Sequence, residues 1–401
     1  MKKLLFMSPQ NYAVRKIDIV DISNYIFQKI NEIIPRLTKR EIFGSSPPEV
    51  FVGRFGYPKV FVGPVVPPFT GDTTSLVLTE TWFGKNLEEI IEMRLKAIRG
   101  KYLIEIDNVD SKYALELHDM ILSRKSVDSE VIFKRPPKGL RLSFDHQPFG
   151  PSGYLEYFRA YPGSSDFKLE RAYYDTDLKA HDAVLELYFS GEPVSRIQQA
   201  LSAGMLGTSR YRKFVPTRWS ITAVDDMISK YLLKEVRQYP IIDTFRTYYL
   251  EYLDNRWIIL LIPTAWEYES IEAFLPGTLD DRYVAIGGDY EPYKGRTTYA
   301  SIGGCYYSAR LAITEKLFKE KKQAAALVLR EAHPGYKVPV GVWNVRESVR
   351  NALRRDPYKF ETVKEVLDFI SSKMALPIEI WIQHSYILKK LTKQKTLFDL
   401  K

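Results

Sequence analysis

Residues 43–69 read FGSSPPEVFVGRFGYPKVFVGPVVPPF, a stretch in which glycines and prolines separate large apolar residues. Its two apolar runs, Val50–Val52 and Val60–Val62, consist of β-branched and aromatic residues, which predict short strands. Between them, residues 53–58 contain two glycines and a proline, which is typical of a turn. We therefore predict an ordered, turn-rich β element here and not a linker.

Outward from this element, the sequence mixes helical and strand patterns without a regular strand–helix alternation. Some segments carry apolar residues at the period of a helix, and others are short β-prone runs. We expect helices at 18–37, 87–98, 112–124, 179–201, 222–237, 308–323, 345–355 and 360–374, and strands at 102–109, 247–253, 256–262, 324–330 and 378–382. The fold class is therefore α+β, with mixed sheets whose topology does not follow from these patterns.

Two stretches indicate how the chain is divided. Residues 133–163 are rich in proline and glycine and form either a long ordered loop or a junction within the body. Residues 389–401 contain five lysines and one acid, so we expect a flexible basic tail after a globular body of residues 1–388.

The composition excludes several classes of protein. Of the 401 residues, 45% are hydrophobic, which is too many for a wholly disordered chain, and no run approaches the ~20 apolar residues of a spanning helix. The single cysteine, Cys305, excludes an internal disulfide framework and a thiolate-cluster metal site. We expect a cytoplasmic protein with no membrane partner. Its net charge of +9 fits an acidic partner such as nucleic acid, or solubility alone.

The sequence specifies no reaction. It has no Walker phosphate loop, dinucleotide fingerprint, nucleophile elbow or zinc-protease motif, so no cofactor and no metal are implied. The five histidines are isolated from one another, which favours structural or surface roles. Cys305 is best interpreted as a buried, unreactive thiol.

A basic segment with interspersed aromatic residues gives a better functional signal. Residues 196–219 contain no acid, and they include Arg210, Arg212, Lys213, Arg218 and Trp219. Arginines contact phosphates and aromatic rings stack on unpaired bases, so the pattern indicates DNA contact; alternatively, the cations pair with acids elsewhere in the fold. A helix-turn-helix beginning at residues 194–201 is weakly indicated. A second basic stripe at Arg346, Arg350 and Arg354 fits either DNA contact or a solvated helix face.

The basic tail ends in apolar residues that no core would cover. Leu397 and Leu400 are three apart, so one 3₁₀ turn would place them on the same side, while Gln394 offers an amide to a polar pocket. The segment resembles the peptide with which many replication and repair proteins bind the sliding clamp (PCNA), the PIP motif. In this sequence the motif consists of Gln394, Lys395, Thr396, Leu397, Phe398, Asp399, Leu400 and Lys401. Leu400 and Lys401 stand where two aromatic residues are usual.

Three further blocks extend the resemblance to most of the chain. They are FGSSPPEVFVGRFGYPKV at 43–60, FVPTRWSIT at 214–222 and YKGRTTYAS at 293–301. With the clamp-binding end, they make the chain similar to the archaeal Nre family of DNA repair proteins. The resemblance implies a role in the response to DNA damage with the clamp as partner, and it supplies no catalytic residues. The cysteine-rich zinc element of some relatives has no counterpart here, because no cysteine precedes Cys305.

The sequence therefore predicts a DNA repair factor that engages damaged or unpaired DNA. Its tail would tether it to the clamp and raise its effective concentration at DNA. A different class is an enzyme acting on DNA or a nucleotide, with Arg54, Arg218, Lys294 and Arg296 clamping phosphates around one pocket. The alternative for these four is turn chemistry and internal ion pairing. A third class is a scaffold that binds only proteins.

Overall fold

The computed structural model describes residues 5–7, 39–140, 144, 146–278 and 282–393, and it has the expected α+β class. The chain forms two compact units. Unit 1 comprises Met1–Asp21, Ser229–Lys337 and Asn344–Lys401, and unit 2 comprises Ile22–Ile228 and Val338–Trp343. The expected sub-boundary near 133–163 therefore lies inside unit 2 and does not separate the units. The helix expected at 18–37 and the clamp motif expected at 394–401 lie outside the described residues.

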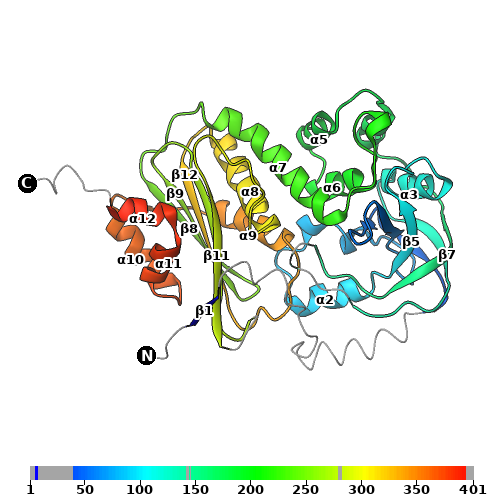
Figure 1. Ribbon diagram of the computed structural model, residues 1–401, viewed down its shortest axis with the longest axis horizontal. Coiled ribbons are helices and arrows are strands. Elements are labelled where there is room, and N and C mark those ends of the chain that lie inside the picture. Colours follow the sequence, from blue (N-terminus) through cyan, green and yellow to red (C-terminus); the bar gives the residue numbers. More distant parts are fainter. Residues whose placement is uncertain (1–4, 8–38, 141–143, 145, 279–281, 394–401) are drawn as a thin grey trace, which may run out of the picture. The chain divides into compact units, whose positions relative to one another are not determined.

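Unit 1 is built on a seven-stranded mixed sheet (Figure 1) in the order β1-β11-β10-β12-β9-β8-β13. The strands are β1 (Leu5–Met7), β8 (Phe245–Tyr252), β9 (Asn255–Ile262), β10 (Tyr268–Phe274), β11 (Tyr283–Glu291), β12 (Ala325–Ala332) and β13 (Tyr358–Phe360). The helices are α8 (Gly304–Glu320), α9 (Trp343–Leu353), α10 (Val363–Lys373), α11 (Ile378–His384) and α12 (Tyr386–Lys393). The chain enters unit 1 within α7 (Thr217–Val236).

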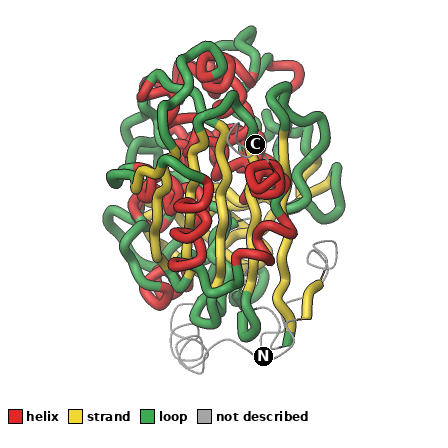
Figure 2. The backbone as a smooth tube through the Cα atoms, turned by 90° about the vertical axis from the view of Figure 1, so that its left-hand side faces the viewer, coloured by secondary structure: helices red, strands yellow, loops and turns green. Residues whose placement is uncertain are grey.

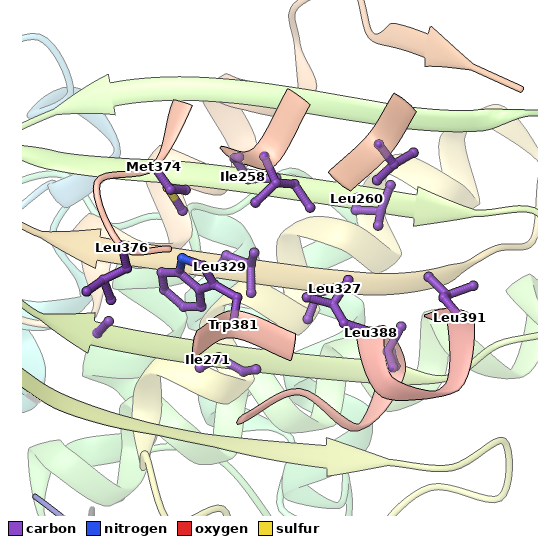
Figure 3. Packing of buried hydrophobic residues seen from close by; sticks show 14 of the residues in the cluster. Ile258, Leu260, Ile271, Leu327, Leu329, Met374, Leu376, Trp381, Leu388 and Leu391 are labelled. Atoms are coloured by element: carbon purple, nitrogen blue, oxygen red, sulfur yellow. The ribbon is translucent and has the colours of Figure 1, made fainter. Parts of the chain in front are cut away.

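The central strands of this sheet are buried on both faces. Every residue of β10 and β12 is buried, because α8 lies on one face and α10–α12 lie across the other (Figures 1 and 2). On the face that α10–α12 cover, the sheet residues Leu327 and Leu329 pack with Trp381, Leu388 and Leu391 of the helices (Figure 3). This double cover explains why the first five residues of β12, Ala325–Leu329, are all apolar without alternation.

Unit 2 is built on a six-stranded mixed sheet in the order β2-β6-β7-β5-β4-β3. The strands are β2 (Glu41–Ser46), β3 (Val50–Val52), β4 (Lys59–Pro64), β5 (Arg99–Glu105), β6 (Val127–Phe133) and β7 (Ser152–Ala160). The helices are α2 (Leu87–Leu95), α3 (Lys112–Leu122), α4 (Phe167–Tyr174), α5 (Ala180–Phe189), α6 (Val194–Ser202) and the first part of α7.

The strands predicted in the block 43–69 are confirmed. Val50 pairs with Pro64 and Val52 with Val62, so β3 and β4 are antiparallel. The glycines of the block allow close contact between backbones: a Cβ on Gly44 would lie 1.9 Å from the carbonyl oxygen of Pro67. Any other residue would therefore force the chain apart here.

Five expectations were wrong or shifted. The single helix expected at 179–201 is two helices, α5 and α6, because Gly191 and Pro193 interrupt it. Residues 378–382 belong to helix α11, because a short apolar run does not distinguish the two periods and Trp381 packs into the core as a helical residue. Residues 133–163 include β7, an inner strand of the sheet. The β8–β9 hairpin turns at Leu253 and Asp254, both with positive φ, one residue earlier than expected. The tail does not begin at residue 389, because α12 continues to Lys393 and buries Leu391.

Candidate nucleic-acid interface

The edge strand β3 joins the two sequence blocks 43–60 and 214–222. As an edge strand, β3 has outward-facing backbone amides that need partners from outside the sheet. The amide of Val50 donates to Oε1 of Gln199 in α6 (3.0 Å), and the amide of Val52 donates to Oγ1 of Thr217 in α7 (2.9 Å). The first turn of α7 is therefore fixed beside the turn that follows β3.

Exposed aromatic rings gather where these two segments meet. The ring centroids of Tyr57 and Trp219 lie 5.4 Å apart, and the Arg54 guanidinium lies 5.1 Å from the centroid of the Phe55 ring. Phe55, Tyr57 and Trp219 remain 67%, 48% and 45% exposed. We call Arg54, Phe55, Tyr57, Arg218 and Trp219 the aromatic patch. Large exposed rings beside cations are typical of a binding surface.

Both chain segments that form the aromatic patch are hydrogen-bonded to Ile106, the residue that follows β5. The amide of Ile106 donates to the carbonyl oxygen of Pro58 (3.0 Å), and the Ile106 carbonyl accepts from the amide of Phe214 (2.8 Å). Within the turn, Lys59 donates from its amide to the Gly56 carbonyl (2.9 Å). These bonds hold the two chain segments at a fixed separation.

The remaining basic residues of the segment 196–219 divide into two groups. Arg212 donates to the carbonyl oxygens of Gly207 (2.7 Å) and Asp175 (2.8 Å), and Lys213 forms an ion pair with Asp107 (3.1 Å). Arg212 and Lys213 are thus bound to groups elsewhere in the fold, which was the alternative to DNA contact. Arg210 is exposed, and its guanidinium lies 4.5 Å from the centroid of the Tyr211 ring. Arg210, Tyr211, Lys213 and Trp219 are thus the exposed cations and rings of the segment, and Arg218 is half-buried.

The weakly indicated helix-turn-helix is not formed. Helix α6 ends at Ser202 and α7 begins at Thr217, so the connection is far longer than the 3–4 residues of that motif. The short 3₁₀ helix Ser209–Tyr211 occupies part of the connection. The segment therefore presents a surface loop and a helix N-terminus.

Lys294 and Arg296, the other two predicted phosphate ligands, lie in a loop of unit 1. Nη1 of Arg296 pairs with Oδ1 of Asp289 (2.8 Å), and its Nε donates to the Thr298 carbonyl (2.9 Å). Oδ2 of Asp289 also accepts from the hydroxyl of Ser301 (2.8 Å). Arg296 therefore stabilises its own loop through internal ion pairing, which was the alternative to phosphate binding. Lys294 is exposed.

A buried ionic cluster beneath the block 43–60 was not predicted. Glu49, fully buried, accepts from Nη1 of Arg94 (3.2 Å) and from the amide nitrogen of Gln147. Burial raises the pKa of the Glu49 carboxyl, and the Arg94 charge opposes that shift. Nε of Arg94 also donates to the Pro148 carbonyl (2.7 Å). The available sequence signal was an acid placed directly before an apolar strand, and its role here is to anchor the start of β3.

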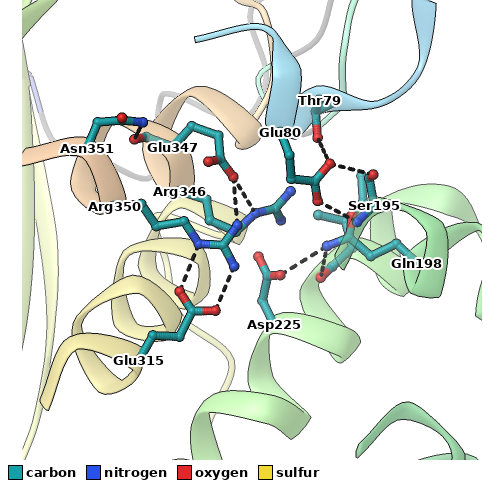
Figure 4. A network of polar contacts seen from close by, with 11 residues as sticks. Thr79, Glu80, Ser195, Gln198, Asp225, Glu315, Arg346, Glu347, Arg350 and Asn351 are labelled. Atoms are coloured by element: carbon teal, nitrogen blue, oxygen red, sulfur yellow. Dashed lines mark hydrogen bonds and ion pairs between the residues drawn. The ribbon is translucent and has the colours of Figure 1, made fainter. Parts of the chain in front are cut away.

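Polar contacts between helices complete the support of α6 and α7 in unit 2 (Figure 4). The Glu80 carboxylate accepts from the amide (2.9 Å) and the hydroxyl (2.6 Å) of Ser195 at the start of α6. Nε2 of Gln198 donates to Oδ1 of Asp225 in α7 (3.0 Å). These contacts fix α6 to α7, so the aromatic patch lies on a rigid support.

The second basic stripe is engaged within unit 1. Arg350 pairs with Glu315 (2.6 Å) and Glu347 (2.8 Å), and the buried Arg346 also contacts Glu347 (3.4 Å), as Figure 4 shows. Arg346 is buried and Arg350 is half-buried, whereas Arg354 is exposed and donates to Oδ1 of Asn351 (3.1 Å), so of the three only Arg354 lies on a solvated face. We therefore assign Arg346 and Arg350 to the stability of α9 rather than to DNA contact.

Family models match both parts of the chain. The archaeal Nre N-terminal model matches residues 21–280, and the archaeal Nre C-terminal model matches residues 291–400. The chain belongs to the archaeal Nre family. This confirms the resemblance seen in the sequence. The gap between the two Nre matches, 281–290, falls at β11 within unit 1, so the family halves and the compact units are not the same.

Three relatives show how far this similarity extends. DNA repair protein NreB of Archaeoglobus fulgidus is 42% identical over 93% of this chain and 96% of its own length. DNA repair protein NreA of the same organism is 33% identical, over 83% of this chain and 85% of its own. DNA repair protein NreA of Haloferax volcanii is 31% identical, over 83% and 84%. In the described part of the chain, no helix is long and apolar enough to cross a membrane.

Proposed function

We propose that this Nre protein acts in DNA repair, holding DNA on the aromatic patch of unit 2 while residues 394–401 bind the sliding clamp. The repair role is supported by the names of relatives that align over most of both chains. The observation that carries the DNA contact is the pair Tyr57 and Trp219, which are half exposed in two segments that also contain Arg54 and Arg218. Residues 193–224 contain no acid, which suits a phosphate backbone.

The DNA contact is tested by the salt dependence of binding. The double variant Arg54→Gln with Arg210→Gln removes two exposed charges, so its affinity for DNA should be lower. The magnitude of the slope of log K against log salt concentration should decrease by about 0.7 to 0.9 for each phosphate that is no longer neutralised. The matched control is Lys112→Gln with Lys319→Gln, which removes two exposed charges elsewhere. Fluorescence anisotropy with labelled oligonucleotides measures both. Equal slopes in the two double variants would exclude these arginines from the interface.

The clamp contact is a separate prediction, and its residues lie outside the described part of the chain. Leu397 and Leu400 should each contribute roughly 1.5–3 kcal/mol if buried in a clamp pocket. Calorimetry of the peptide 394–401 against the clamp should therefore show binding that Leu397→Ala with Phe398→Ala abolishes, whereas Lys395→Ala serves as the control. Leu400→Phe should tighten the complex, because it restores an aromatic where the motif usually has one. Absence of heat from the peptide, together with failure of the whole protein to co-elute with the clamp, contradicts the proposal.

A further inference from the structure

We propose that Tyr57 and Trp219 form a stacking site for an unpaired base of single-stranded DNA. This inference rests on the proposed function, because it names the form of DNA that the aromatic patch takes. The two rings are tilted by 54° at a centroid distance of 5.4 Å, and the fold leaves about half of each ring in water.

The two rings lie on firmly held backbone. Trp219 is in the first turn of the long helix α7, and its amide donates to the Pro216 carbonyl (2.7 Å). The turn that carries Tyr57 is closed by the Gly53 amide, which donates to the Phe61 carbonyl (2.8 Å). Aromatic rings on firmly held backbone lose little conformational entropy when a ligand covers them, so the entropic cost of binding at these rings is small.

The chemistry of the aromatic patch favours an unpaired base over a duplex. Inside a duplex the base faces are already stacked, and a protein reaches only phosphates and base edges. An unpaired base offers a free π-face, and stacking it on an aromatic side chain is sequence-tolerant. Arg54, whose guanidinium lies over the Phe55 ring, and Arg218, which precedes Trp219 in the chain, supply positive charge in the two segments that carry the rings. Single-stranded nucleic acid offers both free base faces for the rings and a row of phosphates for the arginines, so we infer that it is the ligand of the aromatic patch.

The six tryptophans provide a direct readout. Trp219 is half exposed, and the other five, Trp82, Trp257, Trp266, Trp343 and Trp381, are buried. A base stacked on Trp219 should quench its fluorescence. Adding oligo-dT to the full chain should quench the exposed component, and Trp219→Phe should remove that quenching while it keeps an aromatic face and near-normal affinity.

Affinity measurements separate stacking from general DNA binding. Trp219→Leu should weaken single-strand binding about tenfold and change duplex binding less than twofold. Phe167→Leu, which alters a ring in unit 2 that is 69% exposed, is the control and should leave both affinities unchanged. Retention of the fold is checked by thermal unfolding of each variant.

The possible outcomes are distinct. If Trp219→Leu weakens single-strand and duplex binding equally, or if quenching persists in Trp219→Phe, stacking is wrong while the DNA-binding function stands. If neither form of DNA binds the unmodified protein, the proposed DNA contact itself fails. If a protein ligand protects Trp219 from iodide quenching and oligo-dT does not, the aromatic patch is a protein-docking surface and the inference is overturned.

Discussion

His118 shows at the scale of one residue how a polar group is kept neutral in the core of unit 2. Its Nε2 lies 2.9 Å from the Ala203 carbonyl oxygen, and its Nδ1 lies 3.1 Å from the Tyr173 hydroxyl. Burial lowers the pKa of His118 to about 4. The isolated histidines of the sequence were expected to be structural or at the surface, and this one is structural.

The lowered pKa of His118 predicts a dependence of stability on pH. The unfolded chain protonates this imidazole near pH 6.5 and the folded chain near pH 4, so the free energy of unfolding should decrease as the pH falls through that window. The loss should be roughly 2–3 kcal/mol. Urea unfolding of the unmodified protein and of His118→Gln measures it as the difference between the two curves. Curves that stay parallel from pH 7 to pH 4 would show that His118 does not titrate as described.

The residues of the candidate interface show what a single sequence can and cannot reveal. Arg218 and Trp219 were predicted because cations and aromatic rings without acids are visible in a short segment. Tyr57 was not, because its contact with Trp219 depends on β3 docking against α7, which no local pattern encodes. For the same reason the internal partners of Arg212 and Lys213 could be stated only as an alternative.

At the scale of an element, α12 is held by a buried carboxylate. Oε1 of Glu269 in β10 accepts from the Tyr386 amide (2.7 Å), and its Oε2 accepts from the Ile387 amide (2.9 Å) and the Ser385 hydroxyl (2.6 Å). The carboxylate therefore occupies the N-terminus of α12, where unpaired amides and the helix dipole favour negative charge. Burial nevertheless raises the pKa of Glu269.

Replacing this carboxylate should loosen α12. Glu269→Gln puts a donor where an acceptor is needed, so we expect a loss of about 1–3 kcal/mol in unfolding free energy and faster hydrogen exchange at Tyr386 and Ile387. Glu379→Gln, at an exposed position of α11, is the control and should stay within about 0.5 kcal/mol. Chemical denaturation and exchange mass spectrometry measure the two effects. Unchanged exchange in α12 would show that Glu269 does not cap it.

Most elements with a regular pattern or clear turn residues were predicted, whereas some short ambiguous ones were not. Helix α3 and the β8–β9 hairpin follow from periodicity and turn residues. Helix α11 was mistaken for a strand because its seven residues are too few to separate the two periods. Strand β7 was missed because the proline and glycine residues around it obscure its alternation. The order of strands in both sheets depends on contacts distant in sequence and was not predictable.

At the scale of the whole molecule, we expect residues up to the end of α12 to stabilise the body and residues 394–401 to contribute little. Deleting 394–401 should leave the melting temperature unchanged, since it leaves α12 and the core it covers intact. Deleting 389–401 removes Leu391 from the core of unit 1 and should cost about 2–3 kcal/mol. Thermal and urea unfolding compare the two truncations, and clamp binding should be absent in both. Equal stabilities would contradict the packing of Leu391.

If residues 394–401 bind the clamp as proposed, the position where α12 ends affects how the clamp would hold the protein. Lys393 is the last residue of α12, and Gln394, the first residue of the proposed clamp motif, follows it directly, about 3.8 Å away between Cα atoms. The sequence places no residue between the end of α12 and the proposed motif. A clamp that binds Gln394 would therefore lie next to the last turn of α12. The first turn of α12 is in turn bonded to Glu269 in the sheet of unit 1. A direct connection of this kind would fix the orientation of the protein relative to the clamp. Glycines inserted between Lys393 and Gln394 should therefore preserve clamp binding but remove the fixed orientation.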